Sequence, residues 1–148
     1  MSEAFDRQKH IQNLLAEIEQ EMFDDSGQCL KDITGVAGAT AMLGDVAIGV
    51  DRIIMRPGTA FPLHTHEGAH LLYVLKGRGG LHIDGQDYVL GVGDSIYVPA
   101  EHPHGVRGPV GDSTFEILAF GVPHHPVHST TRMTVVDEEA YPGEGPTQ

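Results

Sequence analysis

Short runs of β-forming residues, each bounded by glycine, proline or aspartate, fill the chain after residue 28 and constrain its fold more than any other feature. All but one of the 19 glycines and all nine prolines lie in this part of the chain. The runs cover residues 46–55, 70–75, 80–84, 87–90, 95–99, 114–120 and 132–136. They recur at intervals of about 8 to 12 residues with no helical segment between them, which is typical of an antiparallel sandwich or barrel. The sequence therefore predicts an all-β domain over residues 28–137.

The dipeptide Asp84-Gly85 lies between two of these runs and is a strong signal for a two-residue hairpin. The strands on either side of it should pair antiparallel. A chain of 148 residues has the length of one ordinary domain and can bury a single core. We therefore expect one β-domain, followed by a flexible tail over residues 138–148.

The N-terminal segment, residues 1–27, has a different pattern. Its apolar residues recur at spacings of three and four with glutamates between them, as on one face of an amphipathic helix. These apolar residues are Ile11, Leu14, Leu15, Ile18 and Met22. Gly27 stands where a left-handed residue commonly ends a helix. We expect a helix over residues 2–25 that covers a sheet or a partner subunit.

The charge balance limits the partners of the chain. It has 9 basic and 21 acidic residues and a net charge of −12, which disfavours binding to nucleic acid or to an anionic membrane surface. No apolar stretch approaches the roughly 20 residues that cross a bilayer, and the N-terminus lacks the apolar run of a signal peptide. The single cysteine, Cys29, cannot form an internal disulfide. We therefore expect a soluble, cytoplasmic protein.

Three histidines, His64, His66 and His70, lie within seven positions of an otherwise β-like stretch. Residues two apart on a strand project from the same face, so His64 and His66 can approach one point in space. A turn over residues 67–69 would place His70 at the start of the next strand, facing the same pocket. Converging neutral imidazoles suit a divalent transition metal.

Two motifs in this region resemble those of the cupin superfamily. The first, GTAFPLHTHEGAHLLYVLKG at residues 58–77, contains the three histidines. The second, GDSIYVPAEHPHGVRG at residues 93–108, holds His104 in the position of a metal-binding histidine. Fifteen residues separate the two blocks, the compact spacing of small single-domain microbial cupins. The resemblance implies a cupin (double-stranded β-helix, jelly-roll) barrel of the small cupin 2 type, preceded by the N-terminal helix.

The resemblance also implies a metal site formed by His64, His66, His70 and His104. His70 stands where the first motif usually has glutamate, and Gly108 stands where the second usually has asparagine. The chain is thus similar to four-histidine cupins rather than to the oxalate-handling cupins with three histidines and one glutamate. Four neutral histidines leave a divalent ion at charge +2, which favours an anionic or enol substrate. The expected cofactor is one divalent transition metal per chain, manganese or iron by resemblance, with zinc, nickel and copper as alternatives.

The remaining histidines are not at the ligand positions of the motifs, and simpler roles are expected for them. His102 is expected to be a loop residue and His82 a surface residue of a strand. The tail sequence HHPVH is expected to form a loop or a subunit contact rather than a second metal site, because Pro126 interrupts it. This tail contributes His124, His125 and His128.

Four other residues near the motifs have open roles. Glu101 and Tyr97 are possible acid–base groups, although strand parity alone does not decide which of them points inward. Arg56 and Phe61 either line the mouth of the pocket or are an exposed charge and a core aromatic. Cys29 lies before the barrel and is assigned no catalytic role.

These features predict a metal-dependent enzyme that acts on a small organic molecule, with a dioxygenase reaction on an enol or anionic substrate favoured. The same ion acting purely as a Lewis acid would suit an isomerase, a lyase or a polyketide cyclase. Cupin barrels also serve as non-catalytic modules that bind small ligands, and fold alone does not decide between these functions. A homodimer is expected, because cupins commonly dimerise and the predicted helix offers an apolar face.

Overall fold

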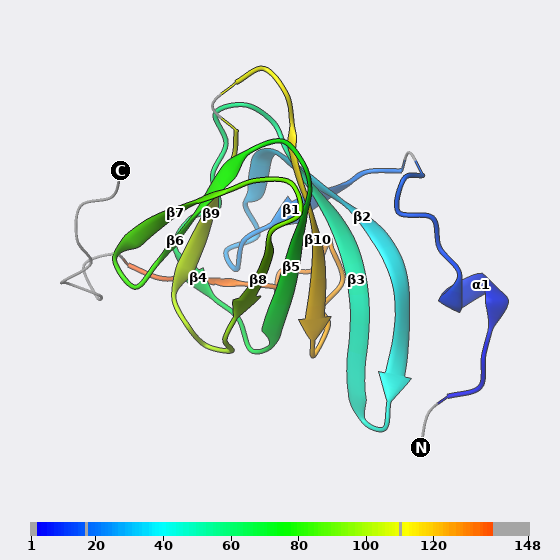
Figure 1. Ribbon diagram of the computed structural model, residues 1–148. Coiled ribbons are helices and arrows are strands. Elements are labelled where there is room, and N and C mark those ends of the chain that lie inside the picture. Colours follow the sequence, from blue (N-terminus) through cyan, green and yellow to red (C-terminus); the bar gives the residue numbers. More distant parts are fainter. Residues whose placement is uncertain (1–2, 17, 110, 138–148) are drawn as a thin grey trace.

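Two antiparallel sheets form the walls of a barrel, and the short N-terminal helix lies outside it beside one edge (Figure 1). The structure is a computed structural model that describes residues 3–16, 18–109 and 111–137. These residues form eleven strands and one short helix. The predicted all-β architecture is confirmed.

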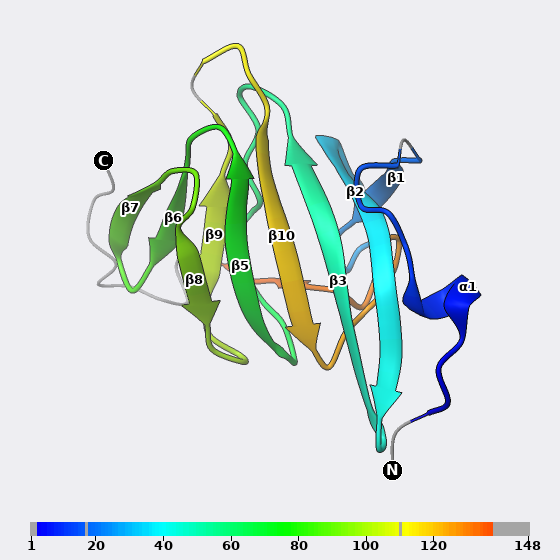
Figure 2. The ribbon, with the colours of Figure 1, turned by 45° about the vertical axis from the view of Figure 1, so that its right-hand side comes forward.

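The elements follow one another in this order: α1 (Arg7–His10), β1 (Gln20–Phe23), β2 (Cys29–Leu43), β3 (Val46–Met55), β4 (His64–Thr65), β5 (Ala69–Lys76), β6 (Gly79–Ile83), β7 (Gln86–Leu90), β8 (Ser95–Val98), β9 (His104–Arg107), β10 (Phe115–Val122) and β11 (Thr134–Val135). One sheet has six strands in the order β1-β2-β3-β10-β5-β8, and the other has five in the order β11-β4-β9-β6-β7. Figure 2 shows the first sheet with β2, β3, β10 and β5 side by side. Neighbours such as β10 and β5 are far apart in sequence, as in a jelly roll.

Alternate residues of the six-stranded sheet face the interior of the barrel, as the period of a β-strand requires. On β3 these are Asp51, Ile53 and Met55, which are all almost fully buried. On β10 they include Ile117 and Ala119, which lie directly opposite Ile53 and Asp51. These inward-facing positions of β3 and β10 are therefore apolar except for one carboxylate.

The hairpin predicted at Asp84-Gly85 is confirmed. The two residues connect β6 to β7, and Ile83 and Gln86 pair on either side of them. Both turn residues have positive φ, 54° for Asp84 and 73° for Gly85. A two-residue turn with two positive φ angles matches the right-handed twist of the strands that it joins.

The long helix predicted over residues 2–25 is wrong. Among the described residues of this segment, only α1 is helical, and the last part of the segment is instead strand β1, paired with β2. Met22, which the helical pattern placed on an apolar helix face, enters the barrel core and is 1% exposed, whereas Ile11 and Ile18 remain 61% and 74% exposed. Hydrogen bonding to β2 and burial of Met22 stabilise the strand, while a short isolated helix is marginal in water.

A helix that crosses a membrane must be long and apolar. Among the helices that can be described, none has both the length and the apolar character that spanning a membrane requires.

Candidate metal centre

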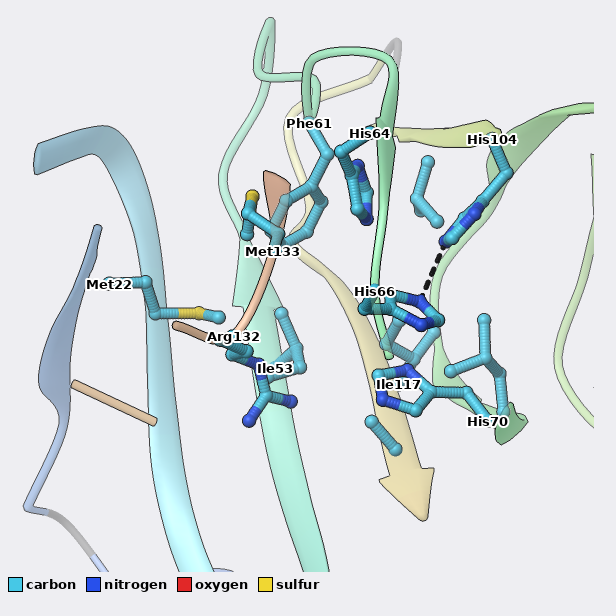
Figure 3. Close-up of a pocket in the computed structure, with 13 residues that line it drawn as sticks. Met22, Ile53, Phe61, His64, His66, His70, His104, Ile117, Arg132 and Met133 are labelled. Atoms are coloured by element: carbon cyan, nitrogen blue, oxygen red, sulfur yellow. Dashed lines mark hydrogen bonds between the residues drawn. The ribbon is translucent and has the colours of Figure 1, made fainter. Parts of the chain in front are cut away.

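Three histidines bring their ring nitrogens together inside the barrel. His64 lies on β4 directly opposite His104 on β9, and His66 follows the end of β4. One nitrogen from each ring lies within 4.8 Å of the others, and all three residues are buried. Figure 3 shows the three rings facing a common space. The structure thus brings together three of the four ligands predicted from the sequence.

Backbone carbonyls fix the proton positions of these three rings. In each ring, Nδ1–H donates to a carbonyl oxygen two residues away. The acceptors are Pro62 for His64 (2.7 Å), Gly68 for His66 (2.6 Å) and His102 for His104 (2.8 Å). A carbonyl oxygen only accepts, so each neutral ring carries its proton on Nδ1 and leaves the Nε2 lone pair free. Hydrogen bonds of this kind commonly orient histidines that bind metals.

The Nε2 atoms of His66 and His104 are 3.1 Å apart, the contact drawn as a dashed line in Figure 3. With both protons on Nδ1, two lone pairs face each other with no proton between them. A cation between the two atoms would remove this repulsion. Two nitrogens that each lie about 2.1 Å from one ion, at right angles, are about 3.0 Å apart. The donor set therefore fits a divalent transition metal.

His70 lies beside this cluster but on the other sheet. Its ring, on β5, stacks on that of His66 with the centroids 4.0 Å apart, and it lines the same cavity. Its Nε2 faces Gly121 on β10, where an added Cβ would come within 3.2 Å. The close group of ligand nitrogens found among the described residues is formed by the other three histidines. His70 is thus next to the site without contributing a nitrogen to the cluster.

Burial keeps all four histidines neutral. Desolvation is the largest cause of the lowered pKa in each, and it lowers the pKa of His104 to about 4 and that of His70 to about 2. The pKa of His64 lies well below the ordinary 6.5, and that of His66 is also lowered. The positive charge of Arg132 acts in the same direction on the pKa of His64, His66 and His70. The rings therefore present lone pairs at neutral pH.

The cavity beside the histidines is small and mostly apolar, with a volume of about 40 Å³. Phe61, with its ring 5.8 Å from that of His64, lines the cavity together with Met22 and Met133. This volume holds an ion with a few ligand atoms. A larger molecule can enter only if side chains move, and methionine is the most adaptable of the apolar residues.

Arg132 lines the same cavity, and the sequence analysis did not identify it. It is 7% exposed, and its Nη1 donates to Oδ2 of Asp51 (2.9 Å) and to the carbonyl of His125 (2.8 Å). The same Oδ2 lies 2.9 Å from Nε2 of His124. The sequence contained one indication of a buried cation such as Arg132. Asp51 shares the inward face of β3 with Ile53, and a carboxylate buried there needs a cation nearby.

The histidines that were not predicted to be ligands contact different residues from one another. The partners are Asp84 for His102, Asp51 for His124, Thr131 and Glu67 for His125, and Gln20 for His128. The structure therefore does not bring the histidines of HHPVH to a common point. The prediction that His82 is a surface residue is wrong, because it is 8% exposed and its Nδ1 lies 2.9 Å from a carboxylate oxygen of Asp87.

Of the four residues with open roles, only Phe61 lines the cavity. Tyr97 is exposed on the outer face of the six-stranded sheet. Arg56 forms an ion pair of 3.0 Å with Glu19 outside the barrel. Glu101 is exposed, and its backbone N–H donates to the carbonyl of the candidate ligand His66 (2.8 Å). Neither Glu101 nor Tyr97 is placed to act as an acid or base in the cavity.

The sequence of this region matches known proteins. Residues 51–121 match the family described as Cupin domain, and this range includes all four predicted ligands. The chain is 45% identical over 51 residues to quercetin 2,3-dioxygenase of Bacillus subtilis, covering 34% of this chain and 15% of that protein. It is 32% identical over 69 residues to an oxalate-binding protein of Thermotoga maritima, covering 46% and 56%. The chain thus spans less than two thirds of the length of these relatives.

The fold matches solved structures over more of the chain. The polyketide cyclase RemF from Streptomyces resistomycificus has a TM-score of 0.59 and 20% identity, covering 97% of this chain and 96% of that one. A cupin 2 conserved barrel domain protein from Rhodopseudomonas palustris has a TM-score of 0.61 and 14% identity, covering 82% and 79%. Identities this low show the fold alone. The predicted cupin barrel is confirmed, and the matches support the cupin superfamily.

Proposed function

We propose that the protein is a metal-dependent cupin enzyme acting on a small organic molecule, with a dioxygenase reaction on an enol or anionic substrate favoured. The observation that carries this proposal is the convergence of the buried Nε2 atoms of His64, His66 and His104, each freed by a hydrogen bond at Nδ1. Buried lone pairs without a partner cost free energy, and apolar side chains would pack the cavity without this cost. Metal binding therefore explains the three oriented histidines better than packing does.

His70 is the proposed fourth ligand. Its ring already stacks on that of His66 in the same cavity, and burial keeps it neutral. A rotation of the side chain that turns a ring nitrogen away from Gly121 would bring that nitrogen toward the other three. Because a bound cation attracts a fourth lone pair, binding and rotation would occur together.

The chain's own contribution to catalysis is to hold, orient and isolate the reactants. A divalent ion bound here would supply Lewis acidity and, if it were manganese or iron, a redox partner for dioxygen. The histidines add no charge, so an enol is favoured to bind as its anion. The apolar walls, which include Phe61, Met22 and Ile117, exclude water from the bound molecule and strengthen each electrostatic interaction within the cavity.

A Lewis-acid reaction without oxidation is the second candidate, as in an isomerase, a lyase or a polyketide cyclase. The uncompensated charge of an ion held by neutral histidines favours this reading, since it stabilises an enolate without any oxidant. A non-catalytic binding role is the third candidate. It is supported by the 32% identity to a protein named oxalate-binding protein.

Metal analysis and an oxygen assay distinguish these candidates. Protein purified without a tag or chelator would be analysed for metals and by electron paramagnetic resonance. We expect about one manganese or iron per chain by resemblance, and zinc would favour the Lewis-acid reading. Oxygen consumption would then be followed with β-diketones, flavonols and catechol-like enols, beside an anaerobic sample. Turnover that continues unchanged without oxygen would contradict the dioxygenase proposal, and binding without turnover would favour the third candidate.

The protein is also proposed to act as a homodimer and to bind neither nucleic acid nor membrane. An apolar row crosses the outer face of the six-stranded sheet, where Tyr97, Leu71 and Phe120 occupy directly opposing positions on β8, β5 and β10. They are 63%, 56% and 41% exposed. A second copy of the chain would cover this face, because a symmetric contact pairs the same apolar patch with itself. The net charge of −12 disfavours nucleic acid and anionic lipid as partners.

A further inference from the structure

Arg132 presents hydrogen-bond donors that no described residue accepts. Its Nη1 is held by Oδ2 of Asp51 and by the carbonyl of His125. Its Nε and Nη2 groups, which share the opposite edge of the guanidinium, make no hydrogen bond within the described part of the chain. Figure 3 shows the guanidinium near Ile53, across the cavity from His70. The arginine is therefore fixed on one side and open on the other.

The charges around the cavity favour a doubly charged ligand. Asp51 is fully buried and compensates the charge of Arg132, so the pair adds no net charge to the barrel interior. Histidines hold a metal as neutral imidazoles and add no charge to the site. A divalent ion would leave the site at +2, and a buried site is stable only when such charge is balanced. A dianion would balance it fully and a monoanion only by half.

Resting on the proposed function, we propose that Arg132 binds the carboxylate of a substrate whose enol oxygens face the histidines. The substrate class is then a small β-dicarbonyl carboxylic acid. It binds as a dianion after its enol proton is released to solvent. A guanidinium edge offers two parallel N–H groups that match the two oxygens of a carboxylate. Arg132 would thus select for a carboxylate at one end of the substrate.

Asp51 and His124 act as positioning residues in this arrangement. Oδ2 of Asp51 contacts both Nη1 of Arg132 and Nε2 of His124, so the three groups restrain one another inside the barrel. The competing explanation is that Arg132 only fastens the segment before β11 to the barrel. That role would use the bonds to Asp51 and His125 and would give no preference among ligands.

Two matched probes separate recognition from fastening. 2,4-Dioxopentanoate and 2,4-pentanedione have the same carbon number and the same β-diketone unit, but only the first carries a carboxylate. Binding would be measured by calorimetry with zinc-loaded protein under anaerobic conditions, so that no turnover occurs. We expect wild-type protein to bind the carboxylate probe at least about tenfold more tightly. Arg132→Gln and Arg132→Lys should abolish or reduce this preference for the carboxylate probe.

A control variant and a second measurement keep the test decisive. Arg56→Gln removes an arginine that pairs with Glu19 outside the barrel, and it should keep the preference. In wild-type protein, the Nε–H resonance of Arg132 should shift on addition of 2,4-dioxopentanoate and not of 2,4-pentanedione, which needs no folded variant.

The outcomes distinguish this inference from the proposed function on which it rests. Equal affinity of wild-type protein for the two probes would overturn the role of Arg132 while leaving metal binding and diketone binding in place. Equal weakening of both probes in Arg132→Gln would identify a fastening role and also overturn it. Failure of wild-type protein to take up zinc, manganese or iron would overturn the proposed function and this inference together.

Discussion

His64 and His104 occupy directly opposite positions on β4 and β9, and their imidazole centroids are 4.3 Å apart. One cross-strand pair thus joins the two sequence motifs at a single point in the barrel. The register between these two short strands fixes the distance between the rings. A shift of one residue would turn one of the rings to the outside, since adjacent residues on a strand face opposite ways.

Removal of one member of this pair should abolish tight metal binding. His104→Ala is expected to lower the affinity for manganese or zinc by on the order of 100-fold or more, because loss of an outer hydrogen-bond partner alone commonly costs about 10 to 100-fold. Affinity would be measured by competition with a chromophoric chelator. His102→Ala is the matched control, since His102 lies two residues away and contacts Asp84 instead of the cavity. Equal affinity of the two variants would contradict the site.

The role of His70 can be tested by two changes. His70→Ala should lower metal affinity by about tenfold or more if its ring supplies the fourth nitrogen. Gly121→Ala keeps His70 but places a Cβ 3.2 Å from its Nε2, and it should alter the manganese resonance spectrum by displacing the ring. If both variants bind metal within about twofold of wild type, with an unchanged spectrum, the site has three histidine ligands and His70 only packs against His66.

The metal-free protein should lose stability as the pH falls from 6.5 to 4.5. Burial lowers the folded-state pKa of His70 to about 2 and of His104 to about 4, whereas the unfolded chain titrates near 6.5. The unfolded state therefore binds more protons in this window, and each such histidine should reduce the free energy of unfolding by about 1.4 kcal/mol per pH unit.

Urea unfolding in the presence of chelator measures this slope. His70→Phe should make it shallower, because a phenyl ring of similar shape has no proton to bind. A wild-type protein whose stability is constant between pH 6.5 and 4.5 would contradict the burial of neutral rings.

The observed fold predicts different losses of stability when Met22 and Ile18 are replaced by alanine. A helix with both residues on its apolar face would predict similar losses. Met22→Ala should destabilise the protein by about 2 to 5 kcal/mol, because Met22 is 1% exposed in the core. Ile18→Ala should change stability by no more than about 0.5 kcal/mol, because Ile18 is 74% exposed. Both values follow from denaturant unfolding. Similar costs at the two positions would favour a packed amphipathic helix over the observed strand.

The proposed dimer can be tested on the outer face of the six-stranded sheet. Phe120→Asp should convert a dimer to a monomer, since a charge in the centre of an apolar contact loses its hydration. Val89→Asp is the control, because Val89 is exposed on β7 of the other sheet. Light scattering coupled to size-exclusion chromatography gives the masses. A monomeric wild-type protein at high concentration would rule the dimer out.

The sequence predicted the features that depend on local spacing. The hairpin at Asp84-Gly85 follows from the backbone preferences of two residues, and β3 coincides with the apolar run at residues 46–55. To predict that His64, His66 and His104 lie together, the resemblance of the two motifs was also needed, because no local rule relates residues that lie about 40 positions apart.

Features that depend on contacts distant in sequence were missed. β2 is 15 residues long, but its glycines, alanines and threonines give no alternating pattern, so only its pairing with β1 and β3 reveals it. The residues around Met22 have helical spacing, yet the edge of β2 offers them a partner. Arg132 begins a β-like run, and the residues next to it in sequence do not show that it is buried by a hydrogen bond to Asp51, 81 residues earlier.

The cavity wall is built from two kinds of segment with different freedom to change. The histidines lie on or beside strands within the barrel, whereas Met22 comes from the edge strand β1 and Arg132 and Met133 come from the segment before β11. Substitutions in these peripheral segments would reshape the space around a bound molecule without altering the candidate metal ligands or the strand register. Related chains can therefore bind different molecules while they keep the same histidine cluster. The range of bound molecules in such barrels should depend most on residues outside the two sequence motifs.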